Sequence, residues 1–316
     1  MKLSIAFLGA NLAIGAVWAL TFPLTKMAIL GGYRNFGIIF WSALISVAFL
    51  GITVFFTTRR LPLAMPDLWR YAFVGLCGTI LPSAASFTAA QYLPAGVISV
   101  CMSLIPMVAL PMAVAFGIDR PTLPRIVGIS LGLAGVLLIA LPETSLPQPE
   151  MAIFIPLALI AVFFYALEGA GLGRIGRGGL DPLQLLLGAS ILSAGLALPL
   201  AFATGTWAIP KMPFDRSDGA LVLSGVVNVI AYAGYVWLVG RAGAVFAAQV
   251  AYIVTGFGVL WSMLLLGEDY SLWVWAAMAL IFLGLFLVQP RPGKERSLVL
   301  AGGQATLAPV TVPEER

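Results

Sequence analysis

Ten apolar runs follow one another along this sequence, separated by short loops rich in proline and glycine. A helix needs about 20 apolar residues to cross the hydrocarbon core of a bilayer, and most of these runs have that length. The first run is longer than the apolar region of a signal peptide, so we expect it to remain uncleaved. The pattern predicts membrane-spanning helices at residues 5–29, 36–57, 69–92, 95–117, 122–141, 151–173, 182–204, 218–239, 243–266 and 271–289.

The composition supports membrane residence. Hydrophobic residues make up 61% of the 316 positions, charged residues only 9%, and the mean hydropathy is +1.03. A soluble domain has about 25% charged residues, so this chain has too little charge to cover a soluble globule of its size.

Several classes of chemistry are excluded or disfavoured. The sequence contains no histidine, which removes His-based acid–base catalysis and His-ligated metal sites. No nucleophile–base pair is visible near a membrane face, so we expect neither an enzyme nor a cofactor. Residues Gly171–Gly176 fit G-x-G-x-x-G, but they follow a membrane span instead of a strand, and we interpret them as a close-packed helix end. Cys77 and Cys101 lie at depths too different for a disulfide.

The second half of the chain resembles the first. Shifting the sequence by 149 positions places Asp119 on Glu268 and Gly135 on Gly284, with apolar runs on both sides. Five spans per half mean that the second half enters the membrane from the opposite side, which gives an inverted repeat. We predict an all-α integral membrane protein of ten transmembrane helices, with two inverted five-helix repeats around a central cavity. The predicted units are residues 1–142, residues 150–290 and a disordered cytoplasmic tail at 291–316.

The distribution of basic residues predicts the orientation. Of the 17 Lys and Arg residues, only Lys26, Arg34, Lys211 and Arg216 lie on the side opposite the termini. Loops rich in Lys and Arg stay in the cytoplasm, so both termini should be cytoplasmic, in a bacterial-type inner membrane. The basic excess therefore sets topology, and we expect no nucleic-acid partner.

Polar side chains form stripes on several predicted spans. Asn228, Tyr232 and Tyr235 fall at helical spacing on the eighth span, and Gln249 and Tyr252 share a face of the ninth. Lipid cannot solvate such groups, so they either hold the bundle by interhelical hydrogen bonds or line a shared central cavity. The cavity interpretation makes the following residues candidates for substrate binding: Trp18, Thr21, Ser83, Ser103, Tyr165, Asn228, Tyr232, Tyr235, Gln249 and Tyr252.

Prolines and glycines modify three spans. Pro23 and Pro106 each remove a backbone hydrogen bond, so we expect the first and fourth spans to be bent or broken, as is common at transporter binding sites. Gly128, Gly132 and Gly135 form a small-residue face, suited to packing inside the bundle or to a dimer interface.

Only two formal charges lie clearly inside spans. Lys26 is either an interfacial anchor or a gate residue that faces an anion. Glu168 is either a vestibule carboxylate paired with a basic loop residue, or an acid that carries a proton or binds a substrate ammonium. Both are candidates for proton coupling or gating.

Two segments carry a resemblance to a known family. Gly15 to Lys26 (Gly-Ala-Val-Trp-Ala-Leu-Thr-Phe-Pro-Leu-Thr-Lys) resembles the Trp-Gly…Lys signature that opens the EamA-type members of the drug/metabolite transporter superfamily. Leu266 to Glu268, followed by a span with Gly284, is similar to the Leu-Gly-Glu signature that ends their ninth span. The first-half counterpart, Gly117 to Arg120 (Gly-Ile-Asp-Arg), departs from this signature.

The resemblance implies a ten-helix exporter of small metabolites that works by alternating access. Related branches bind phosphorylated compounds through intramembrane Lys and Arg residues. Lys26 is a single such residue in this sequence, so phosphorylated substrates are disfavoured. Aromatic faces with a few amides suit an aromatic or apolar amino acid first and a lipophilic cationic drug second. A non-transporting scaffold or receptor is the alternative from another class. The expected partners are a small-molecule substrate and the lipid bilayer, and the expected state is a monomer or weak homodimer.

Overall fold

The computed structural model describes residues 5–57, 60–210 and 212–289, and all the regular secondary structure in these ranges is helical. The predicted tail at 291–316 lies outside them. The helices are α1 (Ile5–Ala19), α2 (Thr21–Leu30), α3 (Asn35–Thr57), α4 (Met65–Gly75), α5 (Leu81–Tyr92), α6 (Ala95–Met102), α7 (Ile105–Ala115), α8 (Leu123–Ala140), α9 (Ile155–Ile175), α10 (Pro182–Ala203), α11 (Arg216–Ala242), α12 (Ala244–Ala247), α13 (Val250–Leu266) and α14 (Leu272–Val288). A π-helix, η1 (Leu76–Ile80), joins α4 to α5, and a 3₁₀ helix, η2 (Pro149–Phe154), precedes α9.

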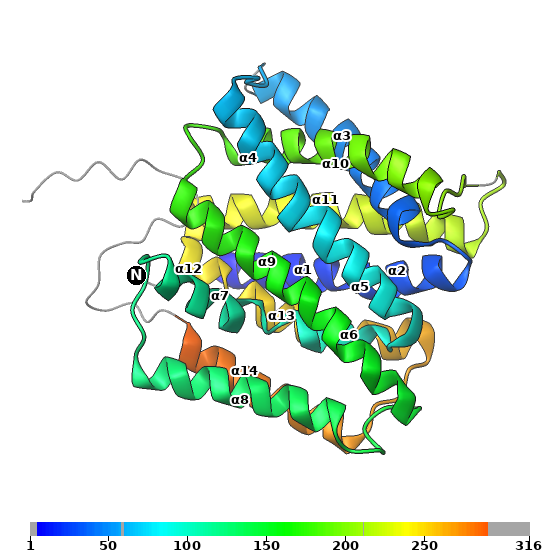
Figure 1. Ribbon diagram of the computed structural model, residues 1–316, viewed down its shortest axis with the longest axis vertical. Coiled ribbons are helices and arrows are strands. Elements are labelled where there is room, and N and C mark those ends of the chain that lie inside the picture. Colours follow the sequence, from blue (N-terminus) through cyan, green and yellow to red (C-terminus); the bar gives the residue numbers. More distant parts are fainter. Residues whose placement is uncertain (1–4, 58–59, 211, 290–316) are drawn as a thin grey trace, which may run out of the picture.

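These helices confirm the predicted all-α membrane fold. Within the described ranges, eight continuous helical segments are long and apolar enough to cross a membrane, and α13 and α14 are shorter apolar helices. The segment α1–α2 runs from left to right in Figure 1, whereas η2–α9, at the start of the second half, runs from right to left. The two halves therefore enter the bundle in opposite directions.

Two helix pairs flank a central group of helices. At one edge α3 packs along α10, and at the other α8 packs along α14 (Figure 1). Between them, α9 packs on α5, α6 and α7, whereas α11 packs on α1, α2 and α3. The small-residue face of α8 allows α8 and α14 to approach closely. A Cβ added to Gly128 on α8 would lie 2.6 Å from the carbonyl oxygen of Gly284 on α14. This confirms the prediction of packing inside the bundle.

Both expected helix interruptions are present. The first falls at Leu20, between α1 and α2, three residues before Pro23. The second falls between α6 and α7, just before Pro106. A proline within a helix deprives the carbonyl four residues earlier of its donor, so each proline favours a break on its N-terminal side. The break between α12 and α13 was not predicted, since residues 243–266 read as one continuous apolar run.

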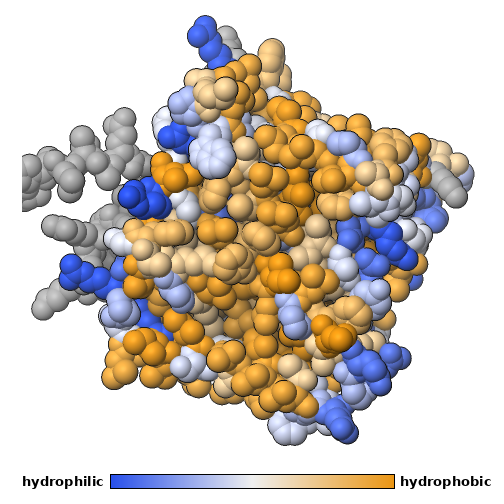
Figure 2. Space-filling view, in the orientation of Figure 1, coloured by the Kyte–Doolittle hydropathy of each residue, from blue (hydrophilic) through white to orange (hydrophobic). Residues whose placement is uncertain are grey.

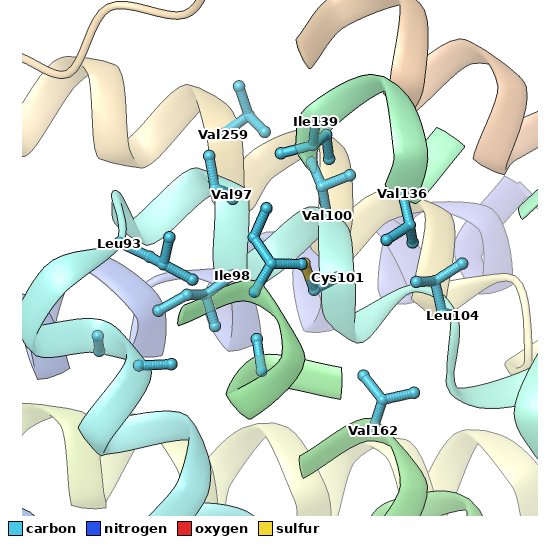
Figure 3. Close-up of a cluster of buried hydrophobic side chains, with 14 of the residues drawn as sticks. Leu93, Val97, Ile98, Val100, Cys101, Leu104, Val136, Ile139, Val162 and Val259 are labelled. Atoms are coloured by element: carbon cyan, nitrogen blue, oxygen red, sulfur yellow. The ribbon is translucent and has the colours of Figure 1, made fainter. Parts of the chain in front are cut away.

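The inside and the outside of the bundle are both apolar. A buried cluster surrounds α6 and joins it to α8, α9 and α13 (Figure 3), with Leu93, Val97, Ile98, Val100, Cys101, Leu104, Val136, Ile139, Val162 and Val259 among its members. On the outer surface, apolar side chains cover the middle of the face in Figure 2, and hydrophilic groups gather towards its left and right ends. Exposed residues such as Ile52 (63%) and Phe286 (61%) suit a surface that contacts lipid. Cys77 and Cys101 are both free thiols, as predicted.

Candidate substrate-binding site

The two ends of the bundle differ in their polar groups, and we name each by one residue. The Lys26 end contains the C-terminus of α2, the turn between α5 and α6, and the loop between α13 and α14. The Arg177 end contains the C-terminus of α9 and the loop that follows it. These ends lie at the right and the left of Figure 1 respectively.

An aromatic cluster joins α1 of the first half to α11 of the second half. The ring of Trp18 on α1 lies 6.3 Å from the ring of Tyr232 and 5.8 Å from that of Tyr235, both on α11. Its indole Nε1 donates a hydrogen bond to Oδ1 of Asn228 at 3.2 Å. The stripe predicted on the eighth span therefore does meet Trp18, and three aromatic rings and an amide are brought together.

A second polar group comes from α9 and the helix it packs against. Tyr165 lies on α9, which packs on α5, the helix that carries Ser83. One turn further along α9, Glu168 lies against Gly78 of the π-helix, where an added Cβ would be 3.0 Å from the Glu168 Cγ. A π-helix inserts an extra residue into a helical turn, and such turns are frequent at functional sites. Here the π-helix presents a glycine to the acid, so the sequence leaves room for the Glu168 side chain.

Glu168 lacks a countercharge. In the described part of the chain, ion pairs join Arg70 to Asp67 and Arg125 to Asp119, and none involves Glu168. The pairing of Glu168 with a basic loop residue, one of the two sequence interpretations, is therefore not formed in this structure.

Four predicted residues lie apart from these groups. Thr21 Oγ1 donates to the Trp18 carbonyl oxygen at 2.7 Å, and Ser103 Oγ donates to the Val100 carbonyl oxygen at 2.6 Å, so both hydroxyls serve the helix breaks beside them. The ring of Tyr252 packs 5.6 Å from that of Phe282 on α14, and its hydroxyl is buried without a hydrogen-bond partner. Gln249 is exposed at the start of α13, and its side chain does not cap that helix.

Lys26 has a different environment from either one predicted. Its Nζ donates to the carbonyl oxygens of Ala90 at 2.6 Å and Leu93 at 2.9 Å, at the C-terminal end of α5. These carbonyls lack helical partners, and the positive charge also suits the negative end of the helix dipole. Lys26 is thus a side-chain cap on a neighbouring helix.

Glu268 completes the same turn from the other half of the chain. Its carboxylate accepts hydrogen bonds from the backbone N–H groups of Ala95 at 2.8 Å and Gly96 at 3.2 Å, at the N-terminus of α6. The Tyr270 hydroxyl donates to Glu268 and accepts from Gly96 N–H at 3.0 Å. Burial and the neighbouring Glu268 raise the pKa of Tyr270, so this phenol stays protonated. The two segments that carried the family resemblance therefore meet at the turn between α5 and α6.

A cavity of about 640 Å³ lies beside this turn. It is lined by Lys26, Tyr92 and Pro94 on one side and by the loops around Ser145 and Glu268 on the other. Of its charged side chains, Lys26 and Glu268 already bind backbone groups.

Comparison with known proteins decides the family. The model of the EamA-like transporter family matches residues 4–141 and again residues 152–289. The chain belongs to the EamA-like transporter family. The two matches cover the two halves of the fold.

Curated relatives agree with this assignment. Over 202 residues the chain is 28% identical to proteins named "Uncharacterized inner membrane transporter YedA" from Escherichia coli K12 and from strains O6:H1 and O157:H7. The match spans 63% of this EamA-like chain and 63% of each relative. A solved crystal structure with 18% sequence identity aligns with a TM-score of 0.60, over 88% of this chain and 96% of the other, which shows a shared fold alone. The family and the relatives' names support an inner-membrane location.

Sequence reasoning missed two residues of the site region. Gly78 gave no signal, because a single glycine in an apolar span does not reveal a π-helix. Arg177 was counted only as a topogenic charge, yet its Nη1 is buried and has no hydrogen-bond partner. Its position next to a helix end was the one available clue.

Proposed function

We propose that this transporter exports a small amphipathic metabolite, with an aromatic or apolar amino acid as the best candidate. The observation that carries the proposal is the cluster of Trp18, Tyr232 and Tyr235 with Asn228. Three rings offer apolar contact to a side chain, and Asn228 and the tyrosine hydroxyls offer hydrogen bonds to a polar head.

The direction of transport follows from the proposed orientation. The excess of Lys and Arg at the termini and their side of the bundle favours cytoplasmic termini, which places the Arg177 end in the cytoplasm. The charges at the Lys26 end are held by backbone groups of α5 and α6, and this supports the proposal that this end is the closed one. Substrate then enters from the cytoplasm and leaves when the Lys26 end opens, as alternating access requires.

Glu168 is the proposed proton carrier. It is an acid on a membrane-spanning helix, and neither ion pair of the described residues involves it. Exchange of a proton for substrate at this carboxylate would couple export to the proton gradient.

A lipophilic cation is the second candidate, favoured by aromatic rings that can make cation–π contacts. The test is transport by the purified protein in liposomes, with radiolabelled phenylalanine and a lipophilic cation as separate substrates. Saturable phenylalanine transport supports the first proposal. Movement of the cation alone supports the second, and movement of neither contradicts both and favours a scaffold or receptor.

A further inference from the structure

The turn between α5 and α6 is held by two charges that belong to different halves of the chain. Lys26 binds two carbonyl oxygens at the end of α5, and all of these groups lie in the first half. Glu268 lies in the second half, and its carboxylate binds the N–H groups of Ala95 and Gly96, 173 and 172 positions earlier. Lys26 therefore fastens the turn to its own half, whereas Glu268 fastens it to the other half.

Two glycines allow the second half to reach this turn. Gly267 ends α13 with a φ of 68°, in the left-handed region that favours glycine, and the chain then continues with Glu268 against α6. Gly96 leaves room for Tyr270, because a Cβ at this position would overlap the Tyr270 hydroxyl oxygen. That hydroxyl accepts a hydrogen bond from Gly96 N–H at 3.0 Å and donates one to Glu268, so it also orients the carboxylate.

The crevice beside the turn separates the two groups that Glu268 joins. In this space of about 640 Å³, Tyr92 and Pro94 belong to the first half, and Glu268 and Asp269 belong to the second. Asp269 is exposed, whereas Ser145, which also lines the crevice, is only 4% exposed. Movement of Glu268 away from the turn would widen this space, so the crevice marks the line along which the halves can part.

We propose that Glu268 is the latch of the Lys26 end: this end stays closed while the carboxylate binds the N-terminus of α6, and the halves separate there when those bonds break. Tyr270 is the residue that positions the carboxylate. The inference rests on the proposed export route, in which substrate leaves at the Lys26 end, and it adds the residue that controls this step. The corresponding acid, Asp119, instead pairs with Arg125 six positions away, so the described residues form this latch at the Lys26 end only.

The strength of these bonds sets the size of the expected effect. Hydrogen bonds to a charged group are about twice as strong as those between neutral groups. Glu268→Gln keeps the shape of the side chain and removes its charge, so we expect it to raise the open fraction about 10- to 100-fold. Tyr270→Phe leaves the carboxylate on the turn and removes only the hydroxyl that orients it, so we expect a rise of about 2- to 10-fold.

The accessibility of a cysteine at Ser145 tests the latch without any substrate. Because Ser145 is almost buried, the Ser145→Cys protein should react slowly with a water-soluble maleimide while the end is closed. The full chain is labelled in lipid nanodiscs, and the labelling of Cys77 and Cys101 in the protein without the reporter is subtracted. Addition of Glu268→Gln or Tyr270→Phe should speed the labelling by the two factors given above.

Two controls separate a latch from a general loss of stability. Asp269→Asn removes the charge of the neighbouring exposed acid and should leave the labelling of Ser145→Cys unchanged. Ser193→Cys places a second reporter on α10, where the native side chain is 0% exposed and does not line the crevice. Glu268→Gln should leave the labelling of this second reporter slow. Tyr270→Phe keeps both the charge and the ring, so it tests the latch even where Glu268→Gln does not fold.

Three results would overturn the inference. The first is equal labelling of Ser145→Cys with and without the latch substitutions. The second is faster labelling of Ser193→Cys to the same extent, which would make Glu268 a structural cap. The third is an equal effect of Asp269→Asn. A protein that shows the expected labelling but moves no phenylalanine in liposomes would keep the latch and lose the proposed substrate, so the two proposals fail separately.

Discussion

The two ends of the bundle carry similar charged groups and use them differently. At the Lys26 end, Lys26 binds two carbonyl oxygens and Glu268 binds two backbone N–H groups, so each charge completes a helix terminus. At the Arg177 end, Glu168 has no ion pair and Arg177 has a buried donor without an acceptor. The difference teaches that charge inside a membrane bundle indicates a ligand only where backbone groups do not already satisfy it.

The same contrast distinguishes the two halves. Glu268 reaches across the bundle to α6, which is 173 positions earlier in the chain. Its counterpart Asp119 instead pairs with Arg125 at 2.8 Å, only six positions away, and caps no helix of the other half. The two acids therefore make different contacts, one across the bundle and one within its own loop.

The largest effect is expected at Glu168. Glu168→Gln keeps the shape of the side chain and removes its charge, so we expect transport to fall about 100-fold and to lose its dependence on pH. Initial rates in liposomes across a pH series measure both. Glu150→Gln is the matched control, because Glu150 is an exposed acid at the other end of the same span. If the Glu168→Gln protein transports substrate with the pH profile of the wild type, Glu168 is not the proton carrier.

Loss of Lys26 should affect stability more than substrate choice. Lys26→Met leaves the Ala90 and Leu93 carbonyl oxygens without their donor, at a cost of about 1–3 kcal/mol. Thermal unfolding of the detergent-solubilised protein measures this cost. We expect Lys26→Met to lower the Tm and to leave the preference for phenylalanine over a lipophilic cation intact. A changed preference with an unchanged Tm would contradict the assignment of Lys26 to the closed end.

Gly78 offers a smaller and more specific test. Alanine there would place a Cβ 3.0 Å from the Glu168 Cγ, whereas alanine at Gly51 meets nothing within 4 Å. Helical Gly→Ala changes normally stabilise by up to about 1 kcal/mol, so Gly51→Ala should raise the Tm and Gly78→Ala should not. Gly78→Ala should also lower transport, because it displaces the carboxylate. Equal behaviour of the two variants would show that Glu168 does not need the glycine.

The smallest effect is expected at the exposed cap of α11. Asp215 accepts hydrogen bonds from the Ser217 hydroxyl and from the Asp218 N–H, and these bonds hold the pKa of Asp215 below its usual value of 3.8. A carboxyl with a lowered pKa stabilises the fold above its unfolded pKa and loses that contribution as the pH falls through the folded pKa. Asp215→Ala should therefore lower the Tm slightly near neutral pH, and the difference should vanish below the usual Asp range. A difference in Tm between Asp215→Ala and the wild type that grows as the pH falls would contradict this prediction.

Much of the fold was accessible from the sequence because a bilayer imposes a simple rule. Runs of apolar residues must become helices long enough to cross it, and prolines such as Pro23 and Pro106 mark where those helices break. The break before Gln249 escaped prediction because no proline or charge marks it. The aromatic stripe on α11 was also predictable, since helical spacing alone places Asn228, Tyr232 and Tyr235 on one face.

The partners of individual charges were not accessible in this way. Lys26 and Glu268 both stood out in the sequence, but nothing in their spacing shows that they cap opposite sides of one turn between α5 and α6. Arg177 looked like a loop charge, and the burial of its Nη1 separates it from exposed Arg174.

The sequence by itself determined the membrane, the helical spans and the two opposed halves, because these depend on hydrophobicity and repetition along the chain. The tertiary structure decided which charges are satisfied and which remain open to a ligand. That distinction depends on contacts between residues more than a hundred positions apart, such as Glu268 with Ala95, and hydrogen-bond geometry across such distances is not encoded in any local pattern.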